Sequence, residues 1–227
     1  MEKIYEMLTL QNRLNTDTNG ADWRSDRTKH GKRINWKRCI YMETAELIDS
    51  FPWKHWKSID ARPNYANVKI ELVDIWHFLM SYLLKNNPLD EAAKLIDNLK
   101  DIKSDIKLPK EWENEKVDEY LDIFEDLMAL ALVKNDSEMM QEELLEQFFK
   151  ACDSVGLGFD ELYKLYIGKN ALNQFRQEKG YKEGTYVKIW NGKEDNEVLH
   201  EILNARDDIT YEELKKELER RYEEAQL

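Results

Sequence analysis

The sequence predicts an all-α protein, and three observations lead to that prediction. Apolar residues recur at helical spacing through most of the chain, while no alternating run of β-branched residues exceeds a few positions. The chain has 227 residues, which is enough for one large domain with a substantial core. No internal repeat of solenoid length is present. We therefore expect a single domain over residues 1–227, a multi-helix bundle with a four-helix core and no significant sheet.

The first predicted helix covers residues 3–15, where apolar side chains repeat at helical spacing. Its last turns carry carboxamides that suit a hydrogen-bonding ligand, namely Gln11, Asn12 and Asn15. A polar connection with two glycines follows at residues 16–35. Because a compact domain seldom keeps so long a connection without a use, we expect it to be an active-site loop.

Two further helices, at residues 36–50 and 68–84, hold the most informative pattern in the chain. The first ends before Pro52, and the aromatic run FPWKHW at 51–56 joins it to the second. The second is apolar almost all round, which is typical of a buried helix. Each helix nevertheless contains two acidic residues at i,i+3 spacing: Glu43 and Glu46 in the first, Glu71 and Asp74 in the second.

These four carboxylates need a partner. A buried carboxylate is costly unless it is protonated, paired or coordinating, and four together repel one another. The neighbouring cations, Lys54, Lys57 and Lys69, are few and mostly placed to face solvent. Oxygen ligands from two facing helices suit hard divalent cations, so we expect the four-helix core to bind Mg²⁺. The alternative is that both pairs are ordinary solvated spacings in a chain with 35% charged residues.

Helical patterns continue beyond these two helices, over residues 88–104, 115–134, 136–154 and 158–179. Only residues 185–190 have the composition of an extended segment. The last helix begins at a capping-box pattern formed by Thr210 and Glu213.

The overall charge argues against one class of function. With a net charge of −12 and a pI near 5.0, the chain lacks the excess of Lys and Arg that general nucleic-acid binding requires. The N-terminus has no signal-peptide pattern, and no apolar run reaches the ~18–20 residues that span a bilayer. Cys39 and Cys152 show no metal or redox spacing. We expect a soluble cytoplasmic protein with reduced thiols and neither nucleic-acid nor membrane partners.

The segment at residues 164–193 is locally basic. It holds seven cationic and two acidic side chains, a local charge of +5, and four of the eight glycines. We expect its later part, about 179–193, to be a flexible loop whose cations repel one another until a phosphate chain supplies the countercharge. A solvated basic face is the simpler alternative from charge alone.

The combination of these features indicates a nucleoside-triphosphate site. It would need the acidic ligands for Mg²⁺, the basic loop, and a pocket of amides and aromatic rings. No Walker sequence and no kinase signature set is present. Hydrolysis by a metal-activated water is therefore the leading reaction class.

The paired acidic motifs resemble those of the all-α nucleoside-triphosphate pyrophosphohydrolases. The segment NALNQFRQEKGYKEGTYVKIWNGKEDN at 170–196 is more specific, because it resembles the late phosphate-binding motif of the dimeric dUTPases. Three shorter motifs resemble the same family, in order along the chain: LQNRLN at 10–15, PWKHWK at 52–57, and Asp74 with His77 and Phe78. One departure is His55, at a position where related sequences can have tryptophan.

That resemblance implies a homodimeric enzyme that hydrolyses dUTP and dUDP to dUMP, uses two or more Mg²⁺ ions per site and limits uracil incorporation into DNA. It implies Glu43 or Glu46 as the catalytic base and all four acidic residues as metal ligands. The implied uracil and deoxyribose contacts are Gln11, Asn15, Trp53, His55, Trp56, His77 and Phe78. The implied phosphate contacts, with a contribution across the dimer interface left open, are Lys169, Asn173, Arg176, Tyr181, Lys182 and Lys188.

Three other functions stay open from the sequence. The first is an all-α pyrophosphohydrolase for another nucleoside triphosphate. The second is a carboxylate-bridged di-iron bundle, since the chain offers two acidic-x-x-His motifs, ending at His77 and His200, although such a site has no use for a basic glycine loop. The third is an acidic helical protein that binds partners through exposed Trp and Tyr.

Overall fold

The computed structural model describes residues 1–58, 60–109, 111–206 and 209–226. Within these ranges the all-α prediction is confirmed, and the only paired strands form a short antiparallel hairpin, β1 (Ile189–Trp190) with β2 (Lys193–Glu194). The helices are α1 (Glu2–Asn19), η1 (Trp23–Ser25), α2 (Trp36–Asp49), α3 (Tyr65–Asn86), α4 (Leu89–Leu99), η2 (Asn114–Lys116), α5 (Val117–Leu132), α6 (Glu138–Ser154), α7 (Phe159–Glu178), α8 (Asp195–Ala205) and α9 (Tyr211–Glu224).

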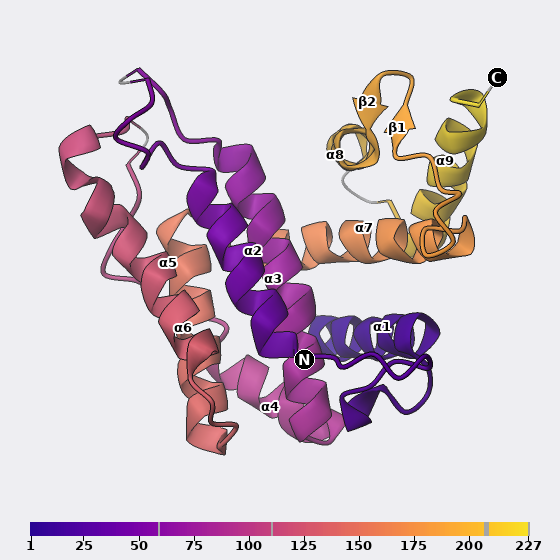
Figure 1. Ribbon diagram of the computed structural model, residues 1–227, viewed down its shortest axis with the longest axis horizontal. Coiled ribbons are helices and arrows are strands. Elements are labelled where there is room, and N and C mark those ends of the chain that lie inside the picture. The colour runs from indigo at the N-terminus through magenta and orange to yellow at the C-terminus, as the bar shows by residue number, and fades with distance from the viewer. Residues whose placement is uncertain (59, 110, 207–208, 227) are drawn as a thin grey trace.

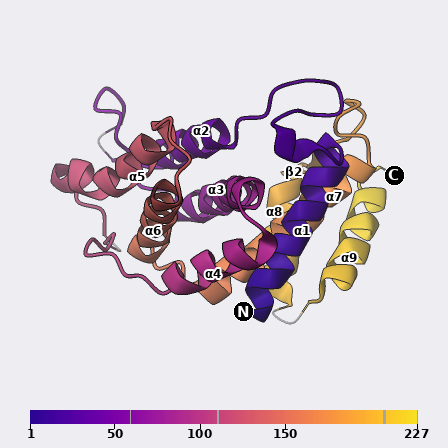
Figure 2. The same ribbon diagram turned by 90° about the horizontal axis from the view of Figure 1, so that it is seen from below.

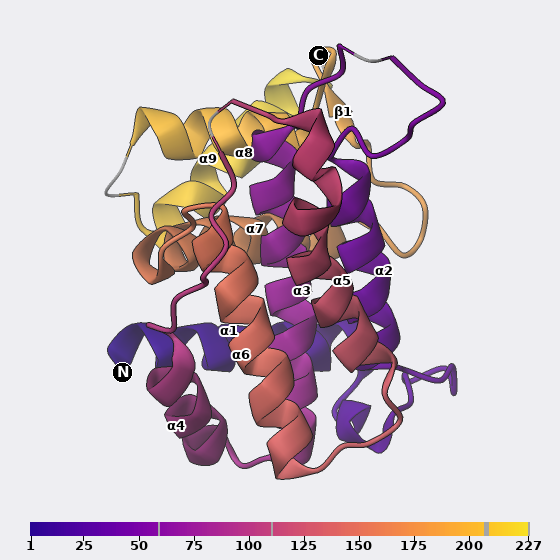
Figure 3. The same ribbon diagram turned by 90° about the vertical axis from the view of Figure 1, so that its left-hand side faces the viewer.

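Helix α3 is the central element, as its nearly continuous apolar sequence predicts. It lies with α2, α5 and α6 in one bundle, while α1 and α7 cross the bundle at a steep angle (Figures 1 and 3). The indole of Trp76 is fully buried and stacks on Phe148 with ring centroids 5.1 Å apart. Helix α3 contacts other helices on several sides. A helix in that position needs apolar side chains on all of those sides, because each side is buried.

The helix starts follow local capping chemistry. Asn35 caps α2 by accepting a hydrogen bond from the Arg38 backbone N–H at 2.9 Å, and Asn64 caps α3 in the same way. At α9 the predicted capping box is confirmed, because Thr210 and Glu213 each bond the backbone N–H of the other. These caps fix where the two acidic helices begin.

The C-terminal lobe, which we define as the hairpin with α8 and α9, packs on the second half of α7. Figures 1 and 2 show it at one end of the molecule, away from α5 and α6. Its own hydrophobic cluster centres on Phe175, Trp190 and Tyr222, whose rings meet edge to face. Helix α7 lies close to the lobe at Gly168, where an added Cβ would lie 2.6 Å from Leu203 Cδ1.

Several predicted boundaries were wrong. The helix predicted at 88–104 is α4 and ends at Leu99. Within the rest of the predicted span, Ser104 donates its backbone N–H to the Asp153 carboxylate, 2.8 Å away, and not to a helical carbonyl. Helix α8 was not predicted, since its 11 residues follow directly on the hairpin. Of the extended segment at 185–190, only β1 pairs as a strand. No helix in the described ranges is long and apolar enough to cross a membrane.

We predict that Gly168→Val destabilises the protein by about 1–3 kcal/mol, because the branched side chain would overlap Leu203 in a packed interface. Helix propensity contributes little, since valine is only slightly better than glycine in a helix. Urea unfolding measures the change. Combining the substitution with Leu203→Ala should cost less than the sum of the two single changes, and additive costs would contradict the proposed overlap.

Candidate active site

Three of the predicted carboxylates meet at the interface of α2 and α3. One oxygen from each of Glu43, Glu46 and Glu71 lies within 4.8 Å of the others. Glu71 is buried, Glu43 is half-buried and Glu46 is exposed, so the group runs from the interface to solvent. Asn67 donates to Glu71 at 3.1 Å. The i,i+3 spacing brings both α2 side chains to the face that meets α3.

The electrostatics of this cluster are unfavourable without a cation. Burial, followed by the neighbouring charges of Asp74, Glu46 and Glu71, raises the pKa of Glu43 to about 8. Burial and the charges of Asp74 and Glu46 raise the pKa of Glu71 to about 7. Oxygen donors held this close with unbalanced charge fit a hard divalent cation, which would relieve both effects. The donor set therefore suits Mg²⁺.

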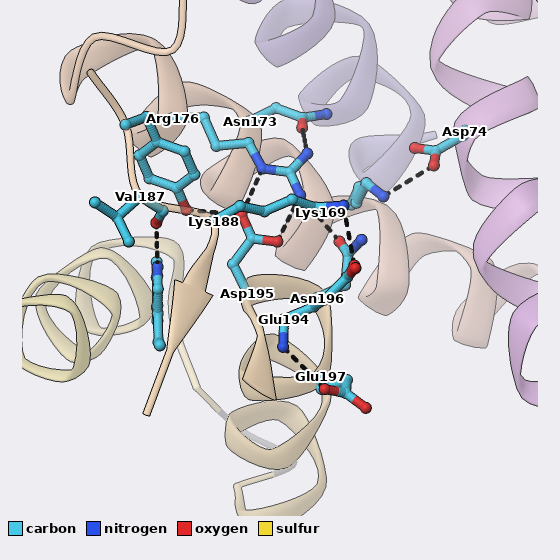
Figure 4. Close-up of polar contacts among 12 residues, drawn as sticks. Asp74, Lys169, Asn173, Arg176, Val187, Lys188, Glu194, Asp195, Asn196 and Glu197 are labelled. Carbon is cyan, nitrogen blue, oxygen red and sulfur yellow. Dashed lines mark hydrogen bonds and ion pairs between the residues drawn. The ribbon is translucent and has the colours of Figure 1, made fainter. Parts of the chain in front are cut away.

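Asp74 lies one turn after Glu71 on α3 and forms an ion pair within the protein. Its carboxylate accepts a hydrogen bond from the Lys169 ammonium, 2.8 Å away, and Lys169 is buried with 7% of its surface exposed. Figure 4 shows this pair bridging α3 and α7. The resemblance to a family placed Lys169 among the phosphate contacts. As charge partners of the carboxylates, only the cations nearby in sequence were considered. The structure adds Lys169 as a charge partner within the acidic site.

A cavity of about 700 Å³ opens beside Asp74. It brings together nine of the residues singled out from the sequence: Gln11, Asn15, Asp74, His77, Phe78, Asn173, Arg176, Tyr181 and Lys182. The polar connection at 16–35 forms a further wall with Thr28, Lys29, His30, Lys32, Arg33 and Ile34. Residues from α1, α3, α7 and two loops therefore line one space of nucleotide size.

Buried amides form the floor of the cavity. Gln11 and Asn15 both donate to the Ser81 hydroxyl at 3.0 Å, and the Tyr166 hydroxyl lies 3.0 Å from Gln11 Oε1. Asn170 in turn donates to Tyr166. Sequence reasoning missed Ser81, Tyr166 and Asn170. The isolated Ser81 in an otherwise apolar helix was the one available signal.

His77 presents a hydrogen-bond acceptor to this space. Its Nδ1 lies 2.8 Å from the Val73 carbonyl and must donate to it, because a carbonyl only accepts. Burial lowers the pKa of His77 to about 4, so the ring is neutral and its Nε2 carries no proton. Within the described chain, Nε2 is buried and has no hydrogen-bond partner. A buried acceptor of this kind favours a ligand with an N–H.

The aromatic knot, which we define as Trp53, His55 and Trp56, does not line this cavity. All three side chains are exposed, with 62% of Trp56 open to solvent, and their rings contact one another. The knot lies in the connection between α2 and α3, at the far end of α2 from Trp36 (Figures 1 and 3). A second cavity of about 520 Å³ lies there, lined by Lys54, Lys57, Arg62, Glu46 and Glu71 among others.

The basic segment is largely balanced by the chain itself. Lys179 pairs with Glu219, Lys193 with Glu201, and Lys188 with Glu194 at 2.9 Å. Acidic residues of the C-terminal lobe therefore supply countercharge, and the expectation that only a phosphate chain could do so was wrong. Lys182 differs, because its ammonium bonds the Thr18 carbonyl at the mouth of the larger cavity.

Comparison with known proteins identifies one family. The family described as dUTPase matches residues 3–181 of the chain. That range contains the acidic cluster, the amide floor and the residues of α7 that line the cavity. Among curated proteins, none matches the chain.

We predict that Glu43→Gln stabilises the metal-free protein at about pH 9 and changes its stability little at about pH 5. The folded-state pKa of about 8 exceeds the ordinary value of 4.5, so the folded protein retains a proton that the unfolded chain releases. The stability that this proton contributes is complete below the ordinary pKa and is lost as pH rises through about 8. Glutamine stays neutral and avoids that loss.

Urea unfolding in the presence of a chelator tests this prediction at the two pH values. Glu125→Gln, on the exposed face of α5, is the matched control. An equal effect of Glu43→Gln at both pH values would show that the carboxylate does not hold a proton in the folded protein.

Proposed function

The chain belongs to the dUTPase family and is a dUTP diphosphatase, and from that premise we propose that it hydrolyses dUTP and dUDP to dUMP with Mg²⁺. One observation carries the proposal: Asp74 lines a cavity of nucleotide size, and its charge acts on Glu43 and Glu71 of the glutamate cluster at the α2–α3 interface. Amides and a neutral histidine line the cavity, and Arg176 and Lys182 lie at its wall. Such an arrangement suits a nucleotide whose phosphates lie toward the carboxylates.

The metal ligands in this proposal are Glu43, Glu46, Glu71 and Asp74, and we propose two or more ions. When bound, the ions neutralise the phosphate chain and make water a better nucleophile. Glu43 or Glu46 then accepts the proton of the attacking water. Glu43 is half-buried beside Glu46 and Glu71, so either α2 glutamate lies within reach of a water held at this cluster. Before a nucleotide binds, Lys169 offsets the negative charge of Asp74.

Uracil recognition follows from the hydrogen-bond pattern of the floor. His77 Nε2 can only accept, so it would take the N3–H of uracil, which the N3 of cytosine lacks. Asn15 has one amide N–H beyond its bond to Ser81 to offer a uracil carbonyl group. Gln11 donates to both Asn15 and Ser81, so it would have to exchange a partner to bond the other carbonyl group. Phe78 would lie against the deoxyribose. Leaving a buried polar group unmatched costs ~1–3 kcal/mol, which is the source of discrimination against cytosine.

The proposed phosphate contacts come from α7 and the loop after it: Lys169, Asn173, Arg176, Tyr181, Lys182 and Lys188. Of these, Asn173, Arg176, Tyr181 and Lys182 line the cavity. Lys188 is paired with Glu194 and would have to exchange that partner.

We also propose that the enzyme is a homodimer. The aromatic knot is exposed and lies apart from the cavity of its own chain, so Trp53, His55 and Trp56 could contact a base only with a second copy or after a rearrangement. A second copy could also supply phosphate contacts. In the cell, such an enzyme in the cytoplasm would limit uracil incorporation into DNA.

The alternatives have less support. Among the described residues, the acidic cluster includes no histidine, which a di-iron bundle would use. Hydrolysis of another nucleoside triphosphate is the nearest alternative. A screen of deoxynucleoside triphosphates and dUDP for Mg²⁺-dependent release of monophosphate decides between them, and turnover of dCTP equal to that of dUTP would contradict the proposed role of His77.

We predict that Glu46→Gln and Asp74→Asn each reduce dUTP turnover by at least about 10³-fold, because each removes a charge from the metal ligands while keeping the side-chain volume. Circular dichroism should show an unchanged helical fold. Glu142→Gln, on an exposed position of α6, is the control for loss of a carboxylate elsewhere. Near-normal turnover in either active-site variant with Mg²⁺ would refute the metal assignment.

We predict that a nonhydrolysable dUTP analogue with Mg²⁺ slows amide hydrogen exchange most strongly at residues 180–185. Residues 181–185 are all exposed, whereas Tyr186 stacks on Tyr222 and Trp190 is buried. Within the predicted loop at 179–193, the backbone of the earlier residues is therefore less restrained, and a ligand can order it more. Equal exchange at 180–185 with and without the analogue would show that this segment does not close over the nucleotide.

A further inference from the structure

Arg176 has most of its hydrogen-bond donors engaged within the protein. Its Nε and Nη2 atoms donate to the two carboxylate oxygens of Asp195, each at 2.8 Å. Nη2 also lies 3.4 Å from the Asn196 side-chain oxygen, and Nη1 donates to Asn173 Oδ1 at 3.2 Å. Of the five N–H groups of a guanidinium, one on Nη1 remains for a ligand. Arg176 is therefore poorly placed to hold a phosphate by a two-point contact.

The partner carboxylate is built into the C-terminal lobe. Asp195 is fully buried at the first residue of α8 and also accepts a hydrogen bond from the Tyr186 hydroxyl at 2.7 Å. The hydrogen bonds and charge of Arg176 offset its burial and hold the pKa of Asp195 below its ordinary value. A two-point contact between buried groups fixes the plane of the guanidinium more firmly than a single contact would.

That fixed guanidinium dictates the orientation of Asn173. Because a guanidinium only donates, the side chain of Asn173 must turn its oxygen toward Arg176 and its NH₂ group away. Figure 4 shows the amide in this orientation. Asn173 lines the cavity, so the group it can offer there is a donor, which suits the acceptor-only oxygens of a phosphate.

We propose that Asp195 is a positioning residue of the active site, which acts through Arg176 to hold the Asn173 amide as a phosphate donor. The inference rests on the proposed function, since it assumes that the cavity takes a nucleotide. It also gives the C-terminal lobe a role in binding. Residues 182–227 lie beyond the part of the chain that matches the family.

The test compares variants of the full chain by their affinity for a nonhydrolysable dUTP analogue with Mg²⁺, for dUMP, and by KM and kcat for dUTP. Asp195→Asn keeps the shape of the side chain but removes the charge that orients Arg176. We expect the affinity for the analogue to fall by at least about tenfold, KM to rise more than kcat falls, and dUMP affinity to change less than about twofold.

A double-mutant cycle separates positioning from general damage. In an Arg176→Gln background, Asp195→Asn should cause little further loss of affinity, because the path to Asn173 is already broken. Leu218→Ala, in the fully buried core of the same lobe, is the control for lost stability. It should lower the melting temperature and leave the affinity for the analogue unchanged.

Three results would overturn the proposal: equal losses for the analogue and dUMP, additive effects in the cycle, or a loss of affinity in Leu218→Ala as large as in Asp195→Asn. Should Asp195→Asn not fold, Tyr186→Phe removes one hydrogen bond to the same carboxylate and keeps the ring. We expect it to lower analogue affinity by about two- to fivefold, and no change would count against the proposal. A wild-type protein that binds no nucleotide would instead refute the proposed function.

Discussion

Crowding of negative charge at the interface of α2 and α3 is the constraint on which the rest of the site depends. Glu43, Glu46 and Glu71 approach within 4.8 Å in a place where burial weakens solvation. The chain reduces this repulsion in two ways. Burial raises the pKa of Glu71, so that it keeps its proton more readily, and the buried ammonium of Lys169 lies beside Asp74. Neither balances the whole cluster. The remaining imbalance is what a divalent cation would correct, and it explains why carboxylates occur at the centre of an apolar bundle.

Charge balance also explains the second half of the molecule. The basic segment after residue 164 stands out in an acidic chain, yet acidic residues that offset it follow soon after in the sequence, in β2, α8 and α9. Ion pairs from α7 to the lobe, Arg176 with Asp195 and Glu178 with Lys215, hold the two together alongside the ring cluster of Phe175, Trp190 and Tyr222. A lobe attached in this way can fix side chains of α7 at the cavity wall.

Local patterns predicted what is local in the structure. The i,i+3 spacing of the α2 glutamates is a property of one helix, so their convergence on one face followed from the sequence, as did the capping box at Thr210 and most helix spans. The partners Lys169–Asp74 and Arg176–Asp195 depend on how α7 crosses α3 and on a short helix that was not recognised, so periodicity could not supply them. The resemblance to a family placed the aromatic knot beside a base. In the single chain the knot lies elsewhere, because the path of the α2–α3 connection is set by tertiary packing.

His77 and the glutamates beyond Asp74 respond to pH in different ranges. With a pKa near 4, the imidazole does not titrate in the physiological range, so His77 keeps one fixed donor and one fixed acceptor. Glu43 and Glu71 neighbour Asp74 but do not line the cavity, and their pKa values of about 8 and about 7 mean that they exchange protons near neutral pH. A change in pH near neutrality would therefore alter the charge of the glutamates without altering the donor and acceptor that His77 offers. Under the proposed function, the rate of hydrolysis and the choice of nucleobase would depend on groups that titrate in separate pH ranges.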